Sequence, residues 1–263
     1  MRPDRQASLA GAALSGTTLS GTALPGVALT HEGGCWLWRD ERLAADALWP
    51  YLHPEGVLPE GVLPEGARIQ TGGRGAAWQV DIDGEVFVCR HYRRGGMMAH
   101  LSSDLYVWTG LERTRAYREF AVMRRAACAG LPVPKPAAAM VCREGGLWGL
   151  GGLFYRASIL TPRIDHVGSL SKVGSESGWF NAGRAIAQMH AAGIWHADLN
   201  VHNILLDAQD QAWLIDFDRA KERVTDSQLF KGNLSRLLRS VNKVCPELGQ
   251  RLWPVLCDGY ALG

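Results

Sequence analysis

The chain lacks the cysteine patterns that hold a metal ion or carry redox chemistry. Its six cysteines are scattered over 263 residues, and no two of them form a Cys-x-x-Cys pair or another metal-binding spacing. A cysteine-based metal site is therefore not predicted. Reduced cysteines in a cytosolic protein are the interpretation that we favour.

An excess of one charge is also absent. The 28 lysines and arginines nearly balance the 26 acidic residues, which leaves a formal net charge of +2. Proteins that bind nucleic acid through their overall charge have a clear basic excess, so we expect no nucleic-acid partner. The length of 263 residues allows one large domain or two small lobes with a proper core.

The N-terminal segment has almost no charge. Residues 6–30 contain no charged side chain and repeat a Gly-x-x-Leu pentad, as GAALS, GTTLS, GTALP and GVALT. Because Arg2 and Arg5 precede this stretch, a signal peptide stays open as an alternative. However, the stretch is rich in Gly, Ser and Thr and has no run of 18 apolar residues, so it is a poor membrane span. We expect residues 1–34 to form a flexible low-complexity extension.

The first half of the remaining chain is rich in predicted strands, at 76–80, 85–90, 137–142 and 153–160. Asp83 and Gly84 stand between the first two runs, and an Asp-Gly pair is a strong hairpin signal. One amphipathic helix is predicted at 111–130, with Gly130 at its end. The apolar residues that can share one face of this helix are Leu111, Tyr117, Phe120 and Met123.

The second half is predicted to be mainly helical. A helix at 179–193 turns Phe180, Ile186, Met189 and His190 inward and ends on a glycine, and a basic amphipathic helix at 229–244 closes the chain. Short strands flank the polar stretch between these helices. The pattern predicts an α+β fold with two lobes, a β-rich N-lobe with one main helix at 35–160 and a smaller helical C-lobe at 161–263. A cleft is expected between them.

Two polar stretches follow apolar runs in the second half. HADLNVHN at 196–203 has the form His-x-Asp-x-x-x-x-Asn, and Asp216-Phe217-Asp218 follows the apolar run before it. Phosphoryl transfer needs an aspartate that orients a hydroxyl and accepts its proton, and oxygen ligands that hold Mg²⁺ against the phosphates. Asp198 is therefore the predicted catalytic base, and Asn203 and Asp216 are the predicted metal ligands.

The first half carries the remaining parts of a nucleotide site, in the expected order. Gly72, Gly73 and Gly75 stand where a glycine-rich phosphate loop is expected. Arg90 occupies the position of a phosphate-pairing lysine, and Glu119 that of its ion-pair partner. Each feature alone has an ordinary explanation, such as a hairpin or a solvated charge. The order and spacing of all of them together indicate an ATP- and Mg²⁺-dependent kinase.

With these motifs in place, the chain resembles the lipopolysaccharide core kinases, a branch of the protein-kinase-like superfamily, over roughly residues 67–245. The resemblance is closest to the members that act on 3-deoxy-D-manno-octulosonic acid (Kdo). It is carried by CRHYRRGG at 89–96, YREFAVMRRAACAGLPVPKPAAA at 117–139, ILTPRI at 159–164, and HADLNVHNILLD with WLIDFDRAK within 196–221.

The resemblance implies a two-lobed kinase fold that uses ATP and Mg²⁺. It implies phosphorylation of a Kdo hydroxyl, the 4-hydroxyl, on a lipid A precursor at the cytoplasmic face of the bacterial inner membrane. The protein would be peripheral and would contact an anionic membrane surface. Leu160, within ILTPRI, is included among the nucleotide-binding residues. Arg93 and Arg94 are candidates for binding the acidic groups of the acceptor, because forked guanidinium groups suit carboxylates and phosphates.

Three departures from protein kinases leave alternatives open. Arg90 replaces the lysine, Asp218 replaces the glycine of Asp-Phe-Gly, and Ala197 replaces the arginine of His-Arg-Asp. An arginine can still pair with phosphate. Only 47 residues of the 263 follow Asp216, without an Ala-Pro-Glu motif, so no peptide substrate is expected. A small-molecule kinase of the aminoglycoside or choline type and a nucleotide-binding pseudokinase remain as alternatives.

Overall fold

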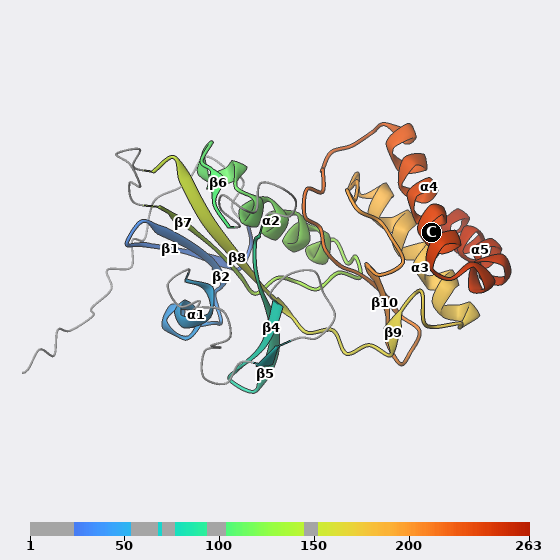
Figure 1. The fold of residues 1–263 in the computed structure, drawn as a ribbon, viewed down its shortest axis with the longest axis horizontal. Coiled ribbons are helices and arrows are strands. Elements are labelled where there is room, and N and C mark those ends of the chain that lie inside the picture. Colours follow the sequence, from blue (N-terminus) through green and yellow to red (C-terminus); the bar gives the residue numbers. More distant parts are fainter. Residues whose placement is uncertain (1–23, 54–67, 70–76, 94–103, 145–151) are drawn as a thin grey trace, which may run out of the picture.

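The fold is described from a computed structural model of the chain, which describes residues 24–53, 68–69, 77–93, 104–144 and 152–263. It has a mixed α/β architecture, as the sequence predicts. A large sheet occupies the N-terminal half, and helices α3 to α5 gather in the C-terminal half (Figure 1). No helix within the described ranges is both long and apolar enough to cross a membrane.

The large sheet has eight strands, and every pairing in it is antiparallel. The strand order is β1-β2-β7-β8-β5-β4-β3, and β6 pairs with β8. The strands are β1 Val27–Glu32, β2 Cys35–Asp40, β3 Arg68–Ile69, β4 Ala77–Ile82, β5 Glu85–His91, β6 Tyr106–Val107, β7 Ala138–Arg143 and β8 Phe154–Pro162.

A helix covers each face of this sheet. Because side chains of a strand alternate between faces, β7 sends Ala139 and Val141 into one core cluster and Met140 into another. Helix α2, Arg115–Cys128, packs in the first cluster, and α1, Ala45–Leu52, packs in the second. Helix α2 lies between the sheet and the C-terminal half (Figure 1), so its side chains can reach both.

Three helices and a small sheet build the C-terminal half. The helices are α3 Glu176–Ala191, α4 Ser227–Val244 and α5 Pro246–Ala261, and the small sheet has the order β11-β10-β9, formed by Ala212–Leu214, Ile204–Leu206 and Gly168–Ser169. Helices α3 and α5 approach closely because glycines stand at the contact. A Cβ at Gly183 would clash with the carbonyl oxygen of Leu256, and one at Gly259 with that of Phe180.

Several predicted elements are confirmed. Strands β4 and β5 form the predicted hairpin, and Asp83 and Gly84 both adopt positive φ angles, 54° and 81°, as a tight hairpin turn requires. Helix α2 ends before Gly130, whose φ of 80° marks a left-handed cap. Its start differs, because residues Leu111–Arg113 form a separate 3-10 turn.

Two expectations at the ends of the chain are corrected. Val27–Glu32, expected within the flexible extension, forms strand β1 and pairs with β2 in register along its whole length. Helix α4 does not close the chain, because Pro246 begins a further helix, α5. Pro254 and two glycines interrupt the apolar periodicity of α5, which hides it in the sequence.

The prediction of reduced cysteines is wrong for one pair. Cys35 of β2 and Cys142 of β7 stand directly opposite each other and form a disulfide, although 107 residues separate them in the sequence. Strand pairing brings them together, and no local sequence pattern could indicate it. The remaining four cysteines are free.

Candidate active site

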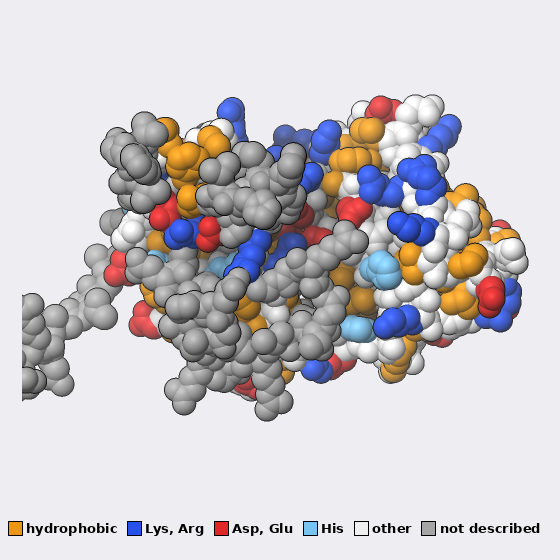
Figure 2. All heavy atoms as spheres, viewed as in Figure 1, with side chains coloured by type: hydrophobic (Ala, Val, Ile, Leu, Met, Phe, Trp, Pro, Cys, Tyr) orange, Lys and Arg blue, Asp and Glu red, His pale blue; other side chains and the backbone are white. Residues whose placement is uncertain are grey.

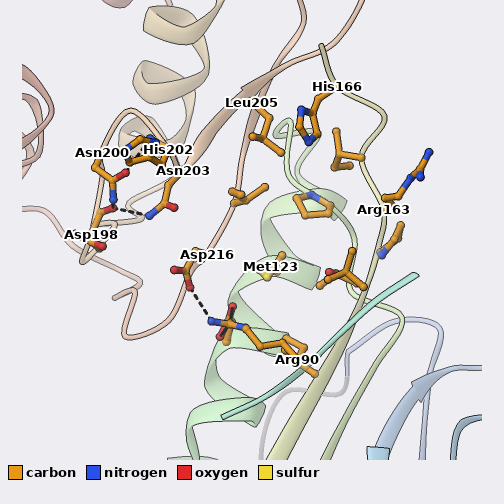
Figure 3. Close-up of a pocket in the computed structure, with 18 of the residues that line it drawn as sticks. Arg90, Met123, Arg163, His166, Asp198, Asn200, His202, Asn203, Leu205 and Asp216 are labelled. Carbon is orange, nitrogen blue, oxygen red and sulfur yellow. Dashed lines mark hydrogen bonds and ion pairs between the residues drawn. The ribbon is translucent and has the colours of Figure 1, made fainter. Parts of the chain in front are cut away.

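Helix α2 and strand β5 bring the predicted ion pair together. Nη2 of Arg90 lies 2.6 Å from Oε1 and 2.7 Å from Oε2 of Glu119. Nη1 of the same guanidinium donates to Oδ1 of Asp216 at 3.0 Å (Figure 3). One arginine therefore links the sheet, helix α2 and the loop after β11.

Burial and the neighbouring charges both shift the pKa values of Arg90 and Glu119. Burial raises the pKa of Glu119, and the Arg90 guanidinium opposes that change. The Tyr92 hydroxyl also donates to Oε2 of Glu119, at 2.5 Å. Burial alone would lower the pKa of Arg90, but Glu119, Tyr92 and Asp216 together hold it above its usual value. The guanidinium therefore stays charged at the floor of the site.

Asp218 has a structural partner that the sequence did not reveal. Its carboxylate forms an ion pair with Arg115, with Nε donating to Oδ1 at 2.9 Å. Arg115 and Glu119 are one helical turn apart on α2, so both side chains lie on the same face of that helix. Helix α2 thus holds the loop at Asp216 through two separate contacts. The aspartate in place of the usual glycine accordingly serves as an anchor for the loop.

The loop after α3 presents the predicted catalytic aspartate. Oδ1 of Asp198 accepts from Nη1 of Arg236 at 2.8 Å. The backbone carbonyl of Asp198 accepts from Nδ2 of Asn200 and from Nδ2 of Asn203, both at 2.9 Å. Figure 3 shows these side chains on one loop, across the cavity from Arg90. Hydrogen bonds within the loop therefore hold its shape, and the Asp198 carboxylate lines the cavity.

His196 fixes the start of this loop from the inside. Its Nε2 donates to the carbonyl oxygen of Ile215 at 3.0 Å, and its Nδ1 accepts from the backbone N–H of Asp198 at 3.1 Å. The side chain is fully buried and packs edge-on against Phe217. Because both ring nitrogens have fixed roles, the imidazole must be neutral. Burial accordingly lowers its pKa.

Helix α4 holds the same loop from the outside. Nδ2 of Asn233 donates to the carbonyl oxygen of His196 at 2.7 Å, and its Oδ1 accepts from the His196 N–H at 3.2 Å. Oγ of Ser240 accepts from the N–H of Val201 at 3.3 Å. Asn233, Arg236 and Ser240 lie one or two turns apart and share a face. One side of α4 therefore holds the loop at 196–201 in position.

A cavity of about 1360 Å³ lies between the sheet and the C-terminal half. Its walls come from β4, β5, α2, β8, the loop at 198–203, the loop at Asp216 and helix α4. Five of the predicted site residues line it, namely Arg90, Glu119, Asp198, Asn203 and Asp216. These five residues, separated by up to 126 positions in the sequence, thus surround one space.

Leu160 does not contribute a side chain to this cavity, which corrects the prediction for it. The side chain is fully buried in the core cluster under α1. Its neighbours Ile159 and Thr161 line the cavity instead, because adjacent residues of a strand point to opposite faces.

The described lining of the cavity includes none of the five remaining predicted residues. Gly72, Gly73, Gly75 and Arg94 fall outside the described residues. Arg93 is described, is exposed just after β5, and is not part of the cavity lining. The roles proposed for these five residues stay predictions.

Sequence reasoning also missed residues that line the cavity. They are Gln79, Val88, Met123, Arg163, His166, His202, Arg236, Arg239, Ser240 and Lys243. A signal for the last four was present in the sequence. The basic amphipathic helix at 229–244 was recognised, but nothing in the sequence indicates which neighbour its charged face meets.

The donor set at Asn203 and Asp216 fits a hard divalent cation. Nδ2 of Asn203 is already engaged by the Asp198 carbonyl, so its Oδ1 remains available as a ligand. The Asp216 carboxylate is 39% exposed and lines the cavity. Carboxylate and amide oxygens are ligands that Mg²⁺ prefers. When bound, such an ion would neutralise phosphate charge and orient the phosphates.

We expect the protein to lose stability as the pH falls below the ordinary histidine value of about 6.5. His196 and His190 are both buried, and burial lowers the pKa of each. The unfolded chain therefore binds protons that the folded chain does not. Each such histidine reduces the free energy of unfolding by up to about 1.4 kcal/mol per pH unit.

Urea unfolding at pH 7.5, 6.5 and 5.5 measures this effect. The midpoint should decrease with pH in the unmodified protein and decrease less in His190→Gln, which cannot take up the proton. A free energy of unfolding that stays constant from pH 7.5 to 5.5 would contradict the assignment of neutral buried histidines.

Comparison with known proteins gives one consistent match. The model of the Lipopolysaccharide kinase (Kdo/WaaP) family matches residues 65–260. Proteins named 3-deoxy-D-manno-octulosonic acid kinase are close relatives. The one from Stenotrophomonas maltophilia (strain R551-3) is 47% identical over 180 residues, which are 67% of this chain and 70% of the relative.

Two further relatives carry the same name. The protein from Xanthomonas campestris pv. campestris (strain B100) is 46% identical over 180 residues, with the same shares covered. The protein from Xylella fastidiosa (strain M23) is 46% identical over 202 residues, which are 74% of this chain and 78% of the relative. The matched region contains the whole of the cavity lining that the structure describes.

Proposed function

The chain belongs to the lipopolysaccharide kinase (Kdo/WaaP) family, and from this membership we propose that it transfers a phosphoryl group to a hydroxyl of Kdo in lipopolysaccharide core biosynthesis. It is accordingly a phosphotransferase that acts on a sugar hydroxyl. The observation that carries the proposal is the position of Asp198, Asn203 and Asp216 around one cavity, with Arg90 at its base.

The finer proposal is that ATP is the donor, Mg²⁺ is required, and the 4-hydroxyl of Kdo on a lipid A precursor is the acceptor. The arrangement proposed is the two-lobed protein-kinase-like fold, with nucleotide against the sheet and acceptor against the C-terminal half. We also propose that the protein works as a peripheral protein at the cytoplasmic face of the inner membrane. Basic and aromatic side chains would contact the anionic lipid surface there.

In this proposal the residues of the chain position the reactants. The acceptor hydroxyl lies against the Asp198 carboxylate, which receives its proton as the new oxygen–phosphorus bond forms. The bond between the γ-phosphorus and the β-phosphate oxygen breaks, and ADP leaves. Arg90 pairs with the phosphates, and its own charge is kept in place by Glu119.

Mass spectrometry tests the proposal directly. The purified protein is incubated with ATP, Mg²⁺ and a Kdo-bearing lipid A precursor, and the expected product gains one phosphate on the sugar. Fragmentation of the product locates the modified hydroxyl. Phosphorylation of aminoglycosides or choline, with no reaction of the Kdo lipid, would favour the small-molecule kinase instead. Nucleotide binding without transfer to either acceptor would favour a pseudokinase.

Arg93 and Arg94 offer a separate prediction. If they hold acidic groups of the acceptor, Arg93→Ala and Arg94→Ala should each raise the acceptor's KM by about tenfold, since a charge-assisted hydrogen bond contributes about 1.5–3 kcal/mol. The KM for ATP should stay unchanged. Both KM values are measured at a fixed low salt concentration. A rise in the KM for ATP alone would place the two arginines at the nucleotide instead.

A further inference from the structure

Helix α4 presents a row of three cations to the cavity. Arg236, Arg239 and Lys243 follow the spacing i, i+3 and i+7, so they lie within an arc of about 60° on the helix. All three line the cavity. Lys231 of the same helix lies about 140° away from Arg236 and does not line it. Figure 2 shows lysine and arginine side chains gathered over α4.

The helix that carries this row is rigidly attached to the catalytic loop. Leu237 and Val241 anchor it in the core. Asn233 and Ser240 hydrogen-bond the backbone of the loop on either side of Asp198. These hydrogen bonds and core contacts join α4 to the loop, so the helix positions that carry the cations are set relative to Asp198. A site that positions a substrate needs such a connection.

The cavity lining has four carboxylates and five lysine or arginine side chains, and two cations of the row have no carboxylate partner. Each acidic side chain of the lining already has a cation: Glu119 and Asp216 share Arg90, Asp198 has Arg236, and Asp165 has Arg163. Within the described part of the chain, Arg239 and Lys243 form no ion pair or side-chain hydrogen bond. Two unmatched cations therefore face the cavity beside the catalytic base.

We propose that Arg239 and Lys243 bind the anionic groups of the acceptor and select it by its acid character. The inference rests on the proposed function and names the part of the site that recognises the substrate. Arg239 stands about 4.5 Å along the helix from Arg236, within one sugar's reach of Asp198. Its fork suits the carboxylate of an octulosonic acid. Lys243 stands about 10 Å along and meets an anion farther out on the acceptor.

Steady-state kinetics with a Kdo-bearing lipid A precursor tests the assignment. Arg239→Gln and Lys243→Gln are each expected to raise the acceptor's KM by about tenfold, because each removes a charge-assisted contact. The kcat and the KM for ATP should change by less than about twofold. Lys231→Gln is the matched control, because it removes the same charge from a position of α4 that does not line the cavity, and its KM values should not change.

Modified acceptors identify the anion that each residue binds. Converting the Kdo carboxylate to its methyl ester should weaken binding to the unmodified protein by about tenfold and should not weaken binding to Arg239→Gln further. A dephosphorylated lipid moiety provides the second arm. If Arg239→Gln no longer lowers affinity for the dephosphorylated acceptor but still lowers affinity for the methyl ester, the anion bound by Arg239 is a lipid phosphate. The anion site is then kept, with a different ligand. If Arg239→Gln lowers affinity for both modified acceptors as much as it does for the unmodified one, the proposal is overturned.

Equilibrium binding separates this inference from the proposed function. Calorimetric titration of the same acceptor, without ATP, reports acceptor affinity whether or not transfer occurs. Failure of the unmodified protein to phosphorylate the lipid would reject the proposed function. Equal acceptor affinity of Arg239→Gln, Lys243→Gln and the unmodified protein would reject the anion site. A rise in the KM for ATP alone would also reject it, because the cations would then belong to the nucleotide.

Discussion

Asp216→Ala is expected to abolish Mg²⁺-dependent binding of ATP. The carboxylate lines the cavity beside Arg90, and together with the free Oδ1 of Asn203 it supplies the oxygen donors at this edge of the site. Without it, one amide oxygen remains, which is too few protein ligands for an ion that keeps most of its water. ATP affinity in the variant should be the same with and without Mg²⁺.

A second substitution separates the loss of a ligand from strain in the backbone. Asp216 has a φ of 62°, a left-handed conformation that asparagine tolerates and alanine does not. Asp216→Asn therefore keeps the backbone and the acceptor for Arg90 while it removes the charge. It should also lose most of the Mg²⁺ dependence. Asp258→Ala, at an exposed position of α5, is the control and should bind Mg²⁺-ATP normally.

Titration calorimetry or fluorescent-nucleotide displacement, each with Mg²⁺ and with a chelator, measures the effect. Retention of Mg²⁺-dependent affinity in Asp216→Asn would remove Asp216 from the metal site. Its structural contact with Arg90 would then be its main role.

The local parts of the site were predictable because they depend on short-range sequence patterns. The hairpin at Asp83 and Gly84 follows from the backbone conformation that these residues adopt readily. The pairing of Arg90 with Glu119 was predicted from the positions that a phosphate-pairing lysine and its partner hold in the order of kinase motifs. Asp198 and Asn203 were identified from the spacing of a single loop, and the structure places them on one closed turn.

The remaining parts depend on contacts between distant segments. Asn233 and Ser240 hold the catalytic loop, but a polar residue in a helix gives no sign of its partner 37 or 39 residues away. The pairing of Asp218 with Arg115 joins residues 103 positions apart. Leu160 shows a different limit. A one-residue step along a strand exchanges a core position for a cavity position, and the adjacent Ile159 and Leu160 of β8 are both apolar.

Asp198→Asn is expected to lower kcat by a factor of about 10² or more, because a positioned proton acceptor contributes on that order. The amide is nearly the same shape as the carboxylate, and its oxygen can still accept from Nη1 of Arg236, now 2.8 Å from Oδ1. The backbone carbonyl that Asn200 and Asn203 share is untouched. The loop should therefore keep its structure and lose only its ability to take the proton.

The affinity for Mg²⁺-ATP is the internal control for this variant. It should stay within about twofold of the unmodified value, because in the proposed function Asp198 receives the acceptor's proton and does not hold the metal ion or the phosphates. A near-normal kcat in Asp198→Asn would exclude Asp198 as the base, and His202, the other titratable side chain of this loop that lines the cavity, would become the group to test.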